Sequence, residues 1–450
     1  MRIHFIAIGG AAMHQLAIAL HLNGNTVTGS DDEIFDPALT NLHRFELIKA
    51  DYTWDPAAIS TDIDLIILGM HARSDNPELM KAKELGIDIV SFPEYVYRAS
   101  QNKKRVVIGG SHGKTTITSM IMHVLKECGR PFDYLVGSRV RGFDVMVSLN
   151  EKNDLIVIEG DEYLSCCLDL RPKFHHYHPH IAVVSGIEWD HINVFPEFDQ
   201  YVDAFRTFVN AVPDNGSIIW CGNDGNVSKL MTEYEGGAES ISYSAVPHRV
   251  ENERVKVMCG SVPVPVNVFG EHNMLNMSAA LEVCRRIGIS DESFFSAISG
   301  FEGAARRLET IYENDGLRIF RDFAHAPSKL KATVNAVKSR FPAEQLVAVF
   351  ELHTFSSMNK KFLPHYSGAL DLADIAAVYF SPHAFELKKL EPFTEAEIRD
   401  GFNNQSLRVL NDADALLGFI KTHVRNPANV LLMSSGNFDN ANFDKIPLLN

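Results

Sequence analysis

Residues 105–129 read RVVIGGSHGKTTITSMIMHVLKECG and decide the fold class of this chain. The apolar run Arg105–Ile108 predicts a buried strand that enters a glycine turn. After the turn, apolar residues recur at helical spacing, and Gly129 stands where a helix would end. These helix-spaced positions are Ile117, Met120, Ile121, Val124 and Leu125. A strand, a tight turn and a helix in this order indicate an α/β fold with a parallel sheet.

The turn itself, Gly110–Thr116, has the composition of a phosphate-binding loop. Its glycines let backbone N–H groups approach phosphate oxygens, and the following helix adds positive potential. Lys114 would reach the β- and γ-phosphates, and the Thr115 hydroxyl would bind Mg²⁺. The full pattern has a glycine where this chain has Ile108, so a glycine turn that binds nothing is the alternative. The predicted nucleoside triphosphate site comprises Gly110, Ser111, His112, Gly113, Lys114, Thr115 and Thr116.

Length, charge and cysteine content limit the number of domains and the kinds of partner that we expect. A chain of 450 residues is too long to fold around one hydrophobic core, which suggests two to three domains. The net charge of −15 argues against non-specific nucleic-acid binding, so we expect no nucleic-acid partner. Six scattered cysteines without a C-x-x-C pair suggest reduced thiols. No signal-like N-terminus and no membrane-length apolar run are present, so we expect a cytoplasmic protein without a membrane partner.

The N-terminal segment alternates strand and helix patterns. The expected elements are strand Ile3–Ile8, helix Met13–Leu22, strands Thr26–Ser30 and Asp64–Gly69, helix Glu78–Gly86 and strand Ile87–Ser91. The turn Gly9–Ala12 is close to a dinucleotide fingerprint, with Ala7 in the first glycine position. Asp31 follows the second strand, where a ribose contact would fall. A tight turn that binds nothing is the alternative. We expect this small parallel α/β domain to end at the polar linker Ser100–Lys104.

Carboxylates follow two apolar strands in the central region. Glu159–Glu162 comes directly after the strand Leu155–Ile158, and Glu188–His191 follows the strand Ile181–Ser185. Acidic groups at the carboxyl ends of parallel strands face the ligand crevice. The sequence therefore predicts a site for two cations together with Thr115, with solvated acidic loops as the alternative.

Two further stretches allow more than one interpretation. The histidine-rich segment His175–His180 could bind zinc, but its adjacent spacing and its proline favour an exposed loop. The stretch Gly270–Ala280 opens a helix expected at Met274–Ile287. Asn273 could read the edge of adenine or could simply cap this helix.

The pattern restarts after Gly303. The expected elements are strand Leu317–Arg321, helix Ser328–Ser339 and strands Leu346–Glu351, Ala376–Ser381 and Asn429–Ser434. They predict a third α/β domain, whose last strand opens into Ser435–Phe438.

In this order and at these separations, the motifs resemble those of the Mur ligase family over nearly the whole chain. They are G-x-H-G-K-T-T at Gly110–Thr116, E-G-D-E at Glu159–Glu162, E-W-D-H at Glu188–His191, G-x-H-N-x-x-N-x-x-A-A at Gly270–Ala280 and D-F-A-H-x-P at Asp322–Pro327. The resemblance implies an α/β protein of three domains. Residues 1–102 would form a Rossmann-like domain for a UDP-sugar, residues 103–304 a P-loop ATPase with a parallel sheet, and residues 305–450 a Rossmann-like domain for the amine.

The resemblance also implies functional residues and the cofactors ATP and Mg²⁺. Lys114, Glu159 and His191 would be catalytic, and Thr115, Glu159 and His191 would hold Mg²⁺. Outside the phosphate loop, ATP would contact His272, Asn273, Asn276, Arg306 and Asp322. The UDP-sugar would contact Gly9, Gly10, Ala11, Ala12, Ser30, Asp31 and His71.

The implied reaction is ATP-dependent amide formation on UDP-N-acetylmuramate through an acyl phosphate. One branch of the family adds L-alanine, and another attaches the recycled tripeptide L-alanyl-γ-D-glutamyl-meso-diaminopimelate. The fragments His71–Pro77, Asp169–Phe174 and Ser434–Phe438 are more similar to the tripeptide branch. The alanine branch typically has H-x-Y-S-R-T where this chain has His353–Met358, with Ser357 in the arginine position. We therefore expect the tripeptide to be the amine substrate, and an L-alanine ligase is the alternative.

Two positions depart from the family pattern: Ala326 replaces a histidine, and Leu352 stands where proline is common. Lys360, Lys361 and His383 are candidate partners for peptide carboxylates, although solvated surface charge is an alternative for each. The expected state is a monomer or weak homodimer acting on small molecules. A nicotinamide-dependent oxidoreductase and a regulatory P-loop protein without ligase activity are the alternatives from other classes.

Overall fold

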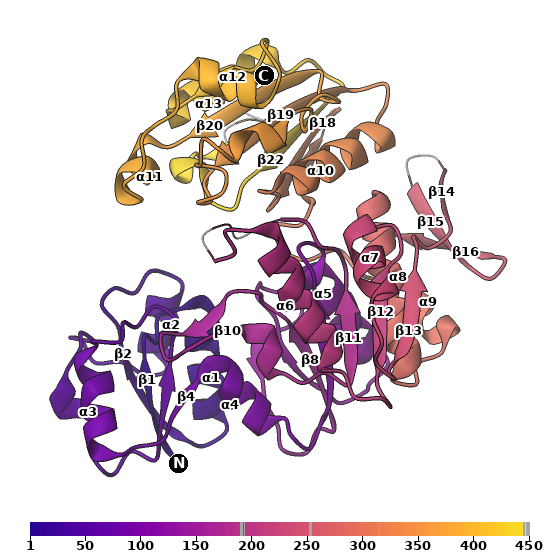
Figure 1. Cartoon of the computed structure of the whole chain (residues 1–450). Helices are drawn as coiled ribbons and strands as arrows, with labels where there is room; N and C mark the ends of the chain where they lie inside the picture. Colours follow the sequence, from indigo (N-terminus) through magenta and orange to yellow (C-terminus); the bar gives the residue numbers. More distant parts are fainter. Residues whose placement is uncertain (190–191, 193, 252–253, 315, 444–445, 447–450) are drawn as a thin grey trace. The chain divides into compact units, whose positions relative to one another are not determined.

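The computed structural model describes residues 1–189, 192, 194–251, 254–314, 316–443 and 446. These residues divide into two compact units (Figure 1). The first unit comprises Met1–Ile187, Asp199–Tyr243 and Ala279–Ser293, and the second comprises Glu188–Phe198, Ser244–Ser278 and Phe294–Asn450. Within the described ranges, no helix is both long enough and apolar enough to cross a membrane.

Parallel strands form the first sheet, in the order β2-β1-β3-β4. They are β1 Arg2–Ile6, β2 Thr26–Ser30, β3 Leu65–Leu68 and β4 Ile89–Ser91. The accompanying helices are α1 Ala11–Leu22, α2 Ala38–Arg44, α3 Pro77–Leu85 and α4 Phe92–Ala99, with the 3-10 helix η1 Pro56–Ala58. The predicted parallel α/β arrangement is confirmed. β1 ends at Ile6 instead of Ile8, and Ala7, in the first glycine position of the fingerprint, adopts a left-handed φ of 67°.

The second sheet of this unit has the order β13-β12-β11-β5-β8-β6-β7, and only the pairing of β6 with β7 is antiparallel among its described strands. Its strands are β5 Lys104–Gly109, β6 Asp133–Leu135, β7 Val147–Ser148, β8 Leu155–Glu159, β11 Ile181–Val184, β12 Ser217–Cys221 and β13 Glu239–Tyr243. The helices are α5 Lys114–Glu127, α6 Phe198–Asn210 and α7 Gly225–Thr232, and a separate ribbon pairs β9 Leu164–Cys166 with β10 Asp169–Pro172. β5 lies between β8 and β11, with Ile108 opposite Glu159 and Gly109 opposite Val184. This register brings the carboxyl ends of three strands to one edge.

The histidine-rich segment is not the exposed loop that we predicted. It forms the 3-10 helix η2 Lys173–His176 and continues into β11. Phe174 and Tyr177 are fully buried and draw the chain inward, so that His176 is buried too. The Arg105 side chain then donates to the carbonyl oxygens of Tyr177 at 2.9 Å and His178 at 3.0 Å. The segment is therefore a packed support beneath β5, and among the described residues no group of His, Cys, Asp and Glu is arranged to hold a metal ion.

The second unit contains a small antiparallel sheet and the C-terminal α/β region. The small sheet pairs β14 His248–Glu251, β15 Arg254–Cys259 and β16 Val262–Val266. Helices α8 Glu271–Arg286 and α9 Asp291–Ile298 follow in the sequence. Because α8 begins at Glu271, Asn273 lies inside its first turn, and the interpretation of Asn273 as a helix cap is wrong.

The C-terminal sheet has the order β17-β18-β22-β19-β20-β21, with β17 antiparallel to β18 and the other pairs parallel. Its strands are β17 Glu309–Asn314, β18 Leu317–Asp322, β19 Gln345–Leu352, β20 Ile375–Phe380, β21 Arg408–Leu410 and β22 Ala428–Met433. The helices are α10 Pro327–Arg340, α11 Pro382–Leu387, α12 Glu395–Gly401 and α13 Ala413–His423, with the 3-10 helices η3 Leu363–Tyr366 and η4 Phe438–Asn440. The predicted third α/β region is confirmed, and the ends of β18, β19 and β22 open onto the same edge.

Candidate active site

The phosphate loop connects β5 to α5 as predicted. Gly110 has a φ of 130° and Gly113 a φ of 77°, conformations that favour glycine. A Cβ atom on Gly110 would lie 2.1 Å from Ser185 Oγ, so a larger residue would collide with the end of β11. The Ser185 hydroxyl also donates to the carbonyl oxygen of His112, which fixes the middle of the loop. The first-turn N–H groups of α5 are therefore presented at the carboxyl edge of the sheet, as a phosphate requires.

Lys114 is held in this loop by an acidic partner. Its Nζ donates to the Gly110 carbonyl oxygen at 2.6 Å and to the two carboxylate oxygens of Glu162 at 2.9 and 2.8 Å. Glu162 has no exposed surface. Burial alone would lower the pKa of Lys114, but the charge and hydrogen bond of Glu162, together with the charges of Asp161 and Glu159, outweigh burial and raise that pKa. Lys114 is thus a charged, oriented group at the position expected for the phosphates.

Two hydroxyl groups connect Glu162 to the phosphate loop through hydrogen bonds. Tyr201 of α6 lies 3.4 Å from Glu162 Oε1 through its hydroxyl, and the Ser111 hydroxyl lies 2.8 Å from the Tyr201 hydroxyl. Glu162 belongs to the motif after β8, yet sequence reasoning gave it no role of its own. Tyr201 carried no signal in the sequence, because only the packing of α6 brings it to the loop.

Oxygen atoms suited to Mg²⁺ meet beside Lys114. The Thr115 hydroxyl donates to Glu159 Oε1 at 2.7 Å, and the backbone N–H of Gly137 donates to Glu159 Oε2 at 2.7 Å. Mg²⁺ commonly uses one or two protein oxygens together with phosphate oxygens, so this pair fits the ion. Asp161 accepts a hydrogen bond from Lys173 Nζ at 2.6 Å. Burial alone would raise the pKa of Asp161, but Lys173, with Lys114 and the backbone N–H of Tyr163, lowers that pKa to about 2. His191, the third predicted metal ligand, lies outside the described residues.

The N-terminal glycine turn and its acid also come together. The N–H of Gly9 donates to Asp31 Oδ2 at 2.7 Å, and burial raises the pKa of Asp31 to about 6. Gly10 precedes α1, in which Ala11 and Ala12 form the first turn. His71 is exposed just beyond β3, the neighbour of β1.

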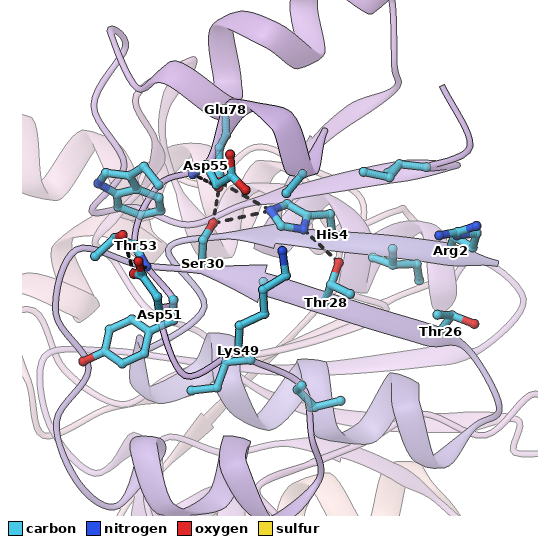
Figure 2. A pocket seen from close by; sticks show the side chains of 18 of the residues that line it. Arg2, His4, Thr26, Thr28, Ser30, Lys49, Asp51, Thr53, Asp55 and Glu78 are labelled. Carbon is cyan, nitrogen blue, oxygen red and sulfur yellow. Dashed lines mark hydrogen bonds and ion pairs between the residues drawn. The ribbon is translucent and has the colours of Figure 1, made fainter. Parts of the chain in front are cut away.

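Ser30 contributes to the turn through its backbone and not through its side chain. Its carbonyl oxygen accepts from the N–H groups of Ala7 and Ile8 at 3.0 and 3.1 Å. Its hydroxyl donates to Glu78 and faces a cavity of about 630 Å³, together with His4 and Thr28 (Figure 2). The alternation of side chains along β2 places Ser30 on the same face of the sheet as Thr28.

The remaining predicted ATP contacts belong to the second unit. Asn273 Nδ2 donates to the Phe269 carbonyl oxygen at 2.9 Å, Asn276 Nδ2 lies 3.5 Å from Asn273 Oδ1, and burial lowers the pKa of His272 to about 4. Asp322 accepts the N–H groups of Leu308 and Ala324, each at 2.6 Å, and burial raises its pKa. The carboxylate thereby holds the turn in which Arg306 has a φ of 57°. Asp322 shapes this turn with both of its oxygens.

Comparison with known proteins agrees with this geometry. Family models match residues 2–104 (Mur ligase family, catalytic domain), 108–284 (Mur ligase middle domain) and 306–436 (Mur ligase, glutamate ligase domain). A UDP-N-acetylmuramate--L-alanine ligase of Sulfurihydrogenibium sp. is 30% identical over 384 residues, which cover 84% of this chain and 82% of the relative.

The chain belongs to the Mur ligase family. Its α/β fold of three domains is therefore the Mur ligase fold, and the chain is an ATP-dependent amide ligase of peptidoglycan synthesis that acts on small molecules. The alternatives of an oxidoreductase and of a regulatory protein without ligase activity are not retained.

Individual relatives divide between two substrates. The UDP-N-acetylmuramate--L-alanyl-gamma-D-glutamyl-meso-2,6-diaminoheptandioate ligase of Escherichia coli is 29% identical and covers 97% of this chain and 96% of the relative. A murein peptide ligase of Psychrobacter arcticus has a TM-score of 0.67 at 23% identity, covering 100% of this chain and 98% of that structure. A UDP-N-acetylmuramate-alanine ligase of Thermotoga maritima has a TM-score of 0.73 at 22% identity, covering 98% and 97%. Both structures support the fold.

Proposed function

We propose that this Mur ligase joins the carboxylate of UDP-N-acetylmuramate to the α-amino group of L-alanyl-γ-D-glutamyl-meso-diaminopimelate. ATP would be converted to ADP and phosphate, and Mg²⁺ would be the metal. The Escherichia coli relative, which matches nearly the full length of both chains, carries this substrate in its name. We also propose the domain boundaries 1–102, 103–304 and 305–450, a monomer or weak homodimer, and a cytoplasmic location.

The observation that carries the choice of amine is the turn after β19. Ser357 is fully buried there; its hydroxyl lies 3.1 Å from the Thr354 carbonyl oxygen, and its N–H donates to Thr354 Oγ1 at 3.1 Å. The alanine branch of the family typically has an arginine at this position. A guanidinium group would bind the carboxylate of a small amino acid in a bidentate manner. The hydroxyl and the N–H of Ser357 form hydrogen bonds within the turn, so this position carries no guanidinium group that could bind a carboxylate.

The proposed reaction needs an activated carboxylate. Transfer of the γ-phosphoryl group of ATP to the sugar carboxylate would give an acyl phosphate, and the amine would then attack that carbonyl and displace phosphate. Phosphoryl transfer depends mainly on positioning and charge stabilisation. Lys114 would supply a fixed positive charge, and the N–H groups of α5 would hold the phosphate oxygens. When bound at Thr115 and Glu159, Mg²⁺ would neutralise triphosphate charge.

The other sites have proposed roles as well. The turn Gly9–Ala12 would bind the UDP pyrophosphate, with Asp31 and His71 on the sugar nucleotide. The proposed role of His191 is a second cation ligand, and this residue lies outside the described ranges. Asn273 and Asn276 would contact the adenine from α8.

The second candidate is a UDP-N-acetylmuramate--L-alanine ligase. Several relatives of that name are 27–31% identical to this chain, so sequence identity alone does not separate the two amines.

One competition experiment tests the choice. The protein is incubated with ATP, Mg²⁺ and UDP-N-acetylmuramate, together with L-alanine and the tripeptide at equal concentrations, and the products are separated by mass. We expect predominantly the tripeptide product. Predominant formation of UDP-N-acetylmuramoyl-L-alanine would replace this proposal with the second candidate.

A further inference from the structure

A cavity of about 420 Å³ opens at the carboxyl edge of the C-terminal sheet, in the second unit. The turn after β19 contributes Phe355, Met358, Asn359 and Lys360, the segment after α11 contributes Leu390 and Glu391, and Ile192 completes the lining. Ligands of parallel α/β sheets bind at this edge. The cavity is far larger than the methyl side chain of alanine requires.

The walls of the cavity are apolar. Phe355 is 48% exposed, Met358 is buried and Leu390 is half-buried. An exposed aromatic ring beside a buried thioether provides a surface for an aliphatic chain. Apolar contact alone would hold such a chain against these walls.

Lys388 fixes the shape of these walls. Its Nζ donates to the His353 carbonyl oxygen, lies 3.5 Å from Met358 Sδ and stands 5.1 Å from the centre of the Phe355 ring. One side chain thus joins two of the segments that line the cavity. The cavity is a built feature of the fold, because its walls are tied to each other by named contacts.

Charges of both signs stand at the mouth. Lys360 Nζ lies 2.9 Å from Glu397 and 3.9 Å from Glu391, and Lys360 and Glu391 both line the cavity. Asn359 adds an amide beside them. A ligand that ends in both an ammonium and a carboxylate group would find a partner for each.

We propose that this cavity binds the side chain of the third residue of the peptide substrate, a diamino acid with an aliphatic stem and a terminal amino and carboxylate pair. The stem lies along Phe355, Met358 and Leu390. The terminal carboxylate pairs with Lys360, and the terminal ammonium pairs with Glu391. This inference rests on the proposed function, and it assigns recognition of the distal end to residues around the turn after β19.

The lining of the cavity distinguishes among the three residues that the sequence offered as partners for peptide carboxylates. Lys360 lines the cavity, whereas Lys361 and His383 are exposed and are not among its lining residues. Lys361 is therefore a matched control, since it is the same residue type one position away.

The test compares three amines with the full-length protein, ATP, Mg²⁺ and UDP-N-acetylmuramate. The first is the tripeptide ending in meso-diaminopimelate, the second is the same tripeptide ending in L-lysine, which lacks the terminal carboxylate, and the third is the dipeptide L-alanyl-γ-D-glutamate. The measured quantity is kcat/KM for each amine in the wild type and in Lys360→Met, Lys361→Met and Phe355→Ala.

In the wild type we expect the diaminopimelate peptide to be used best. Lys360→Met should reduce its advantage over the lysine peptide by about three- to tenfold, the scale of one partly exposed charge contact. Lys361→Met should leave that ratio unchanged. Phe355→Ala should lower both tripeptides relative to the dipeptide. All three side chains are exposed, and the rate with the dipeptide reports directly whether each variant is folded.

The two proposals fail in different ways. If the wild type prefers the tripeptide but the ratio between diaminopimelate and lysine peptides survives Lys360→Met, the distal site is wrong and the proposed function stands. If the wild type prefers L-alanine in the competition experiment and uses none of the three amines well, both are overturned, because alanine has no side chain that reaches the cavity.

Discussion

At the scale of single residues, two acids after β8 have separate tasks. Glu159 accepts from Thr115 and Gly137, whereas Glu162 accepts from Lys114. They are three positions apart in the sequence and would be interchangeable in a motif search. In the proposed mechanism Glu159 would hold the metal, whereas Glu162 holds Lys114.

Substitution should separate these tasks. Lys114→Ala is expected to lower kcat by two or more powers of ten, the scale of a preorganised charge in phosphoryl transfer. Glu159→Gln should raise the Mg²⁺ concentration needed for half-maximal rate. Glu162→Gln should lower kcat by roughly tenfold without that change, because it only loosens Lys114. Metal titrations of ADP release distinguish them, and a raised Mg²⁺ requirement in Glu162→Gln would place that acid on the metal.

Asp31 gives the stability a defined pH dependence. Its pKa is about 6 in the folded chain against an ordinary 3.8, mainly because it is buried. Between these values the folded state binds the proton more tightly than the unfolded state, so this contribution is present below about pH 4 and is lost as the pH rises through 6. Asp31→Asn carries no such proton.

We therefore expect the free energy of unfolding of Asp31→Asn to gain on the wild type by on the order of 1–2 kcal/mol between pH 4 and pH 7. Urea unfolding at several pH values measures the difference. Glu33→Gln, an exposed neighbour, is the control. A difference that stays constant over this range would show that Asp31 does not titrate as described.

At the scale of elements, the β5–α5 unit requires glycine at one position more than at others. A Cβ on Gly110 would meet Ser185, whereas a Cβ on Gly129, at the end of α5, would meet nothing within 4 Å. Both residues have positive φ, but the φ of 130° at Gly110 is less accessible to other residues than the φ of 66° at Gly129, so the backbone and the steric contact both require glycine at position 110.

Gly110→Ala is expected to weaken ATP binding by roughly tenfold or more, equivalent to about 1.4 kcal/mol or more. Gly129→Ala should cost about 1 kcal/mol of stability through its left-handed backbone and leave ATP binding unchanged. Calorimetric titration with ATP provides the measurement, and retained binding of UDP-N-acetylmuramate shows that each variant is folded. Normal ATP affinity in Gly110→Ala would contradict the steric role of Ser185.

At the scale of the whole molecule, we expect two compact units with separate sheets to unfold in more than one cooperative transition. Differential scanning calorimetry should resolve at least two transitions. UDP-N-acetylmuramate should raise the Tm of one of them, since a ligand stabilises the unit that binds it and Gly9–Asp31 lies in the first unit. One transition with equal calorimetric and van't Hoff enthalpies would contradict this expectation.

The sequence alone determined the elements whose causes are local. Arg105–Gly129 predicted a strand, a glycine turn and a helix, because apolar periodicity and glycine placement act within a few residues. The same reasoning placed Asp31 beside the Gly9 turn, since a parallel β-α-β unit brings the ends of its neighbouring strands together. The order and spacing of the motifs also identified the family.

Tertiary structure decided what depends on partners distant in the chain. The histidine segment is packed and not exposed because Phe174 and Tyr177 anchor it in the core and Arg105 binds its carbonyl oxygens. Tyr201 reaches the phosphate loop only because α6 folds back over it, 90 residues from Ser111. The cavity after β19 likewise exists because Lys388 joins segments 35 residues apart. Such contacts leave no periodic trace in the sequence, because burial and distant hydrogen bonds are properties of the folded chain.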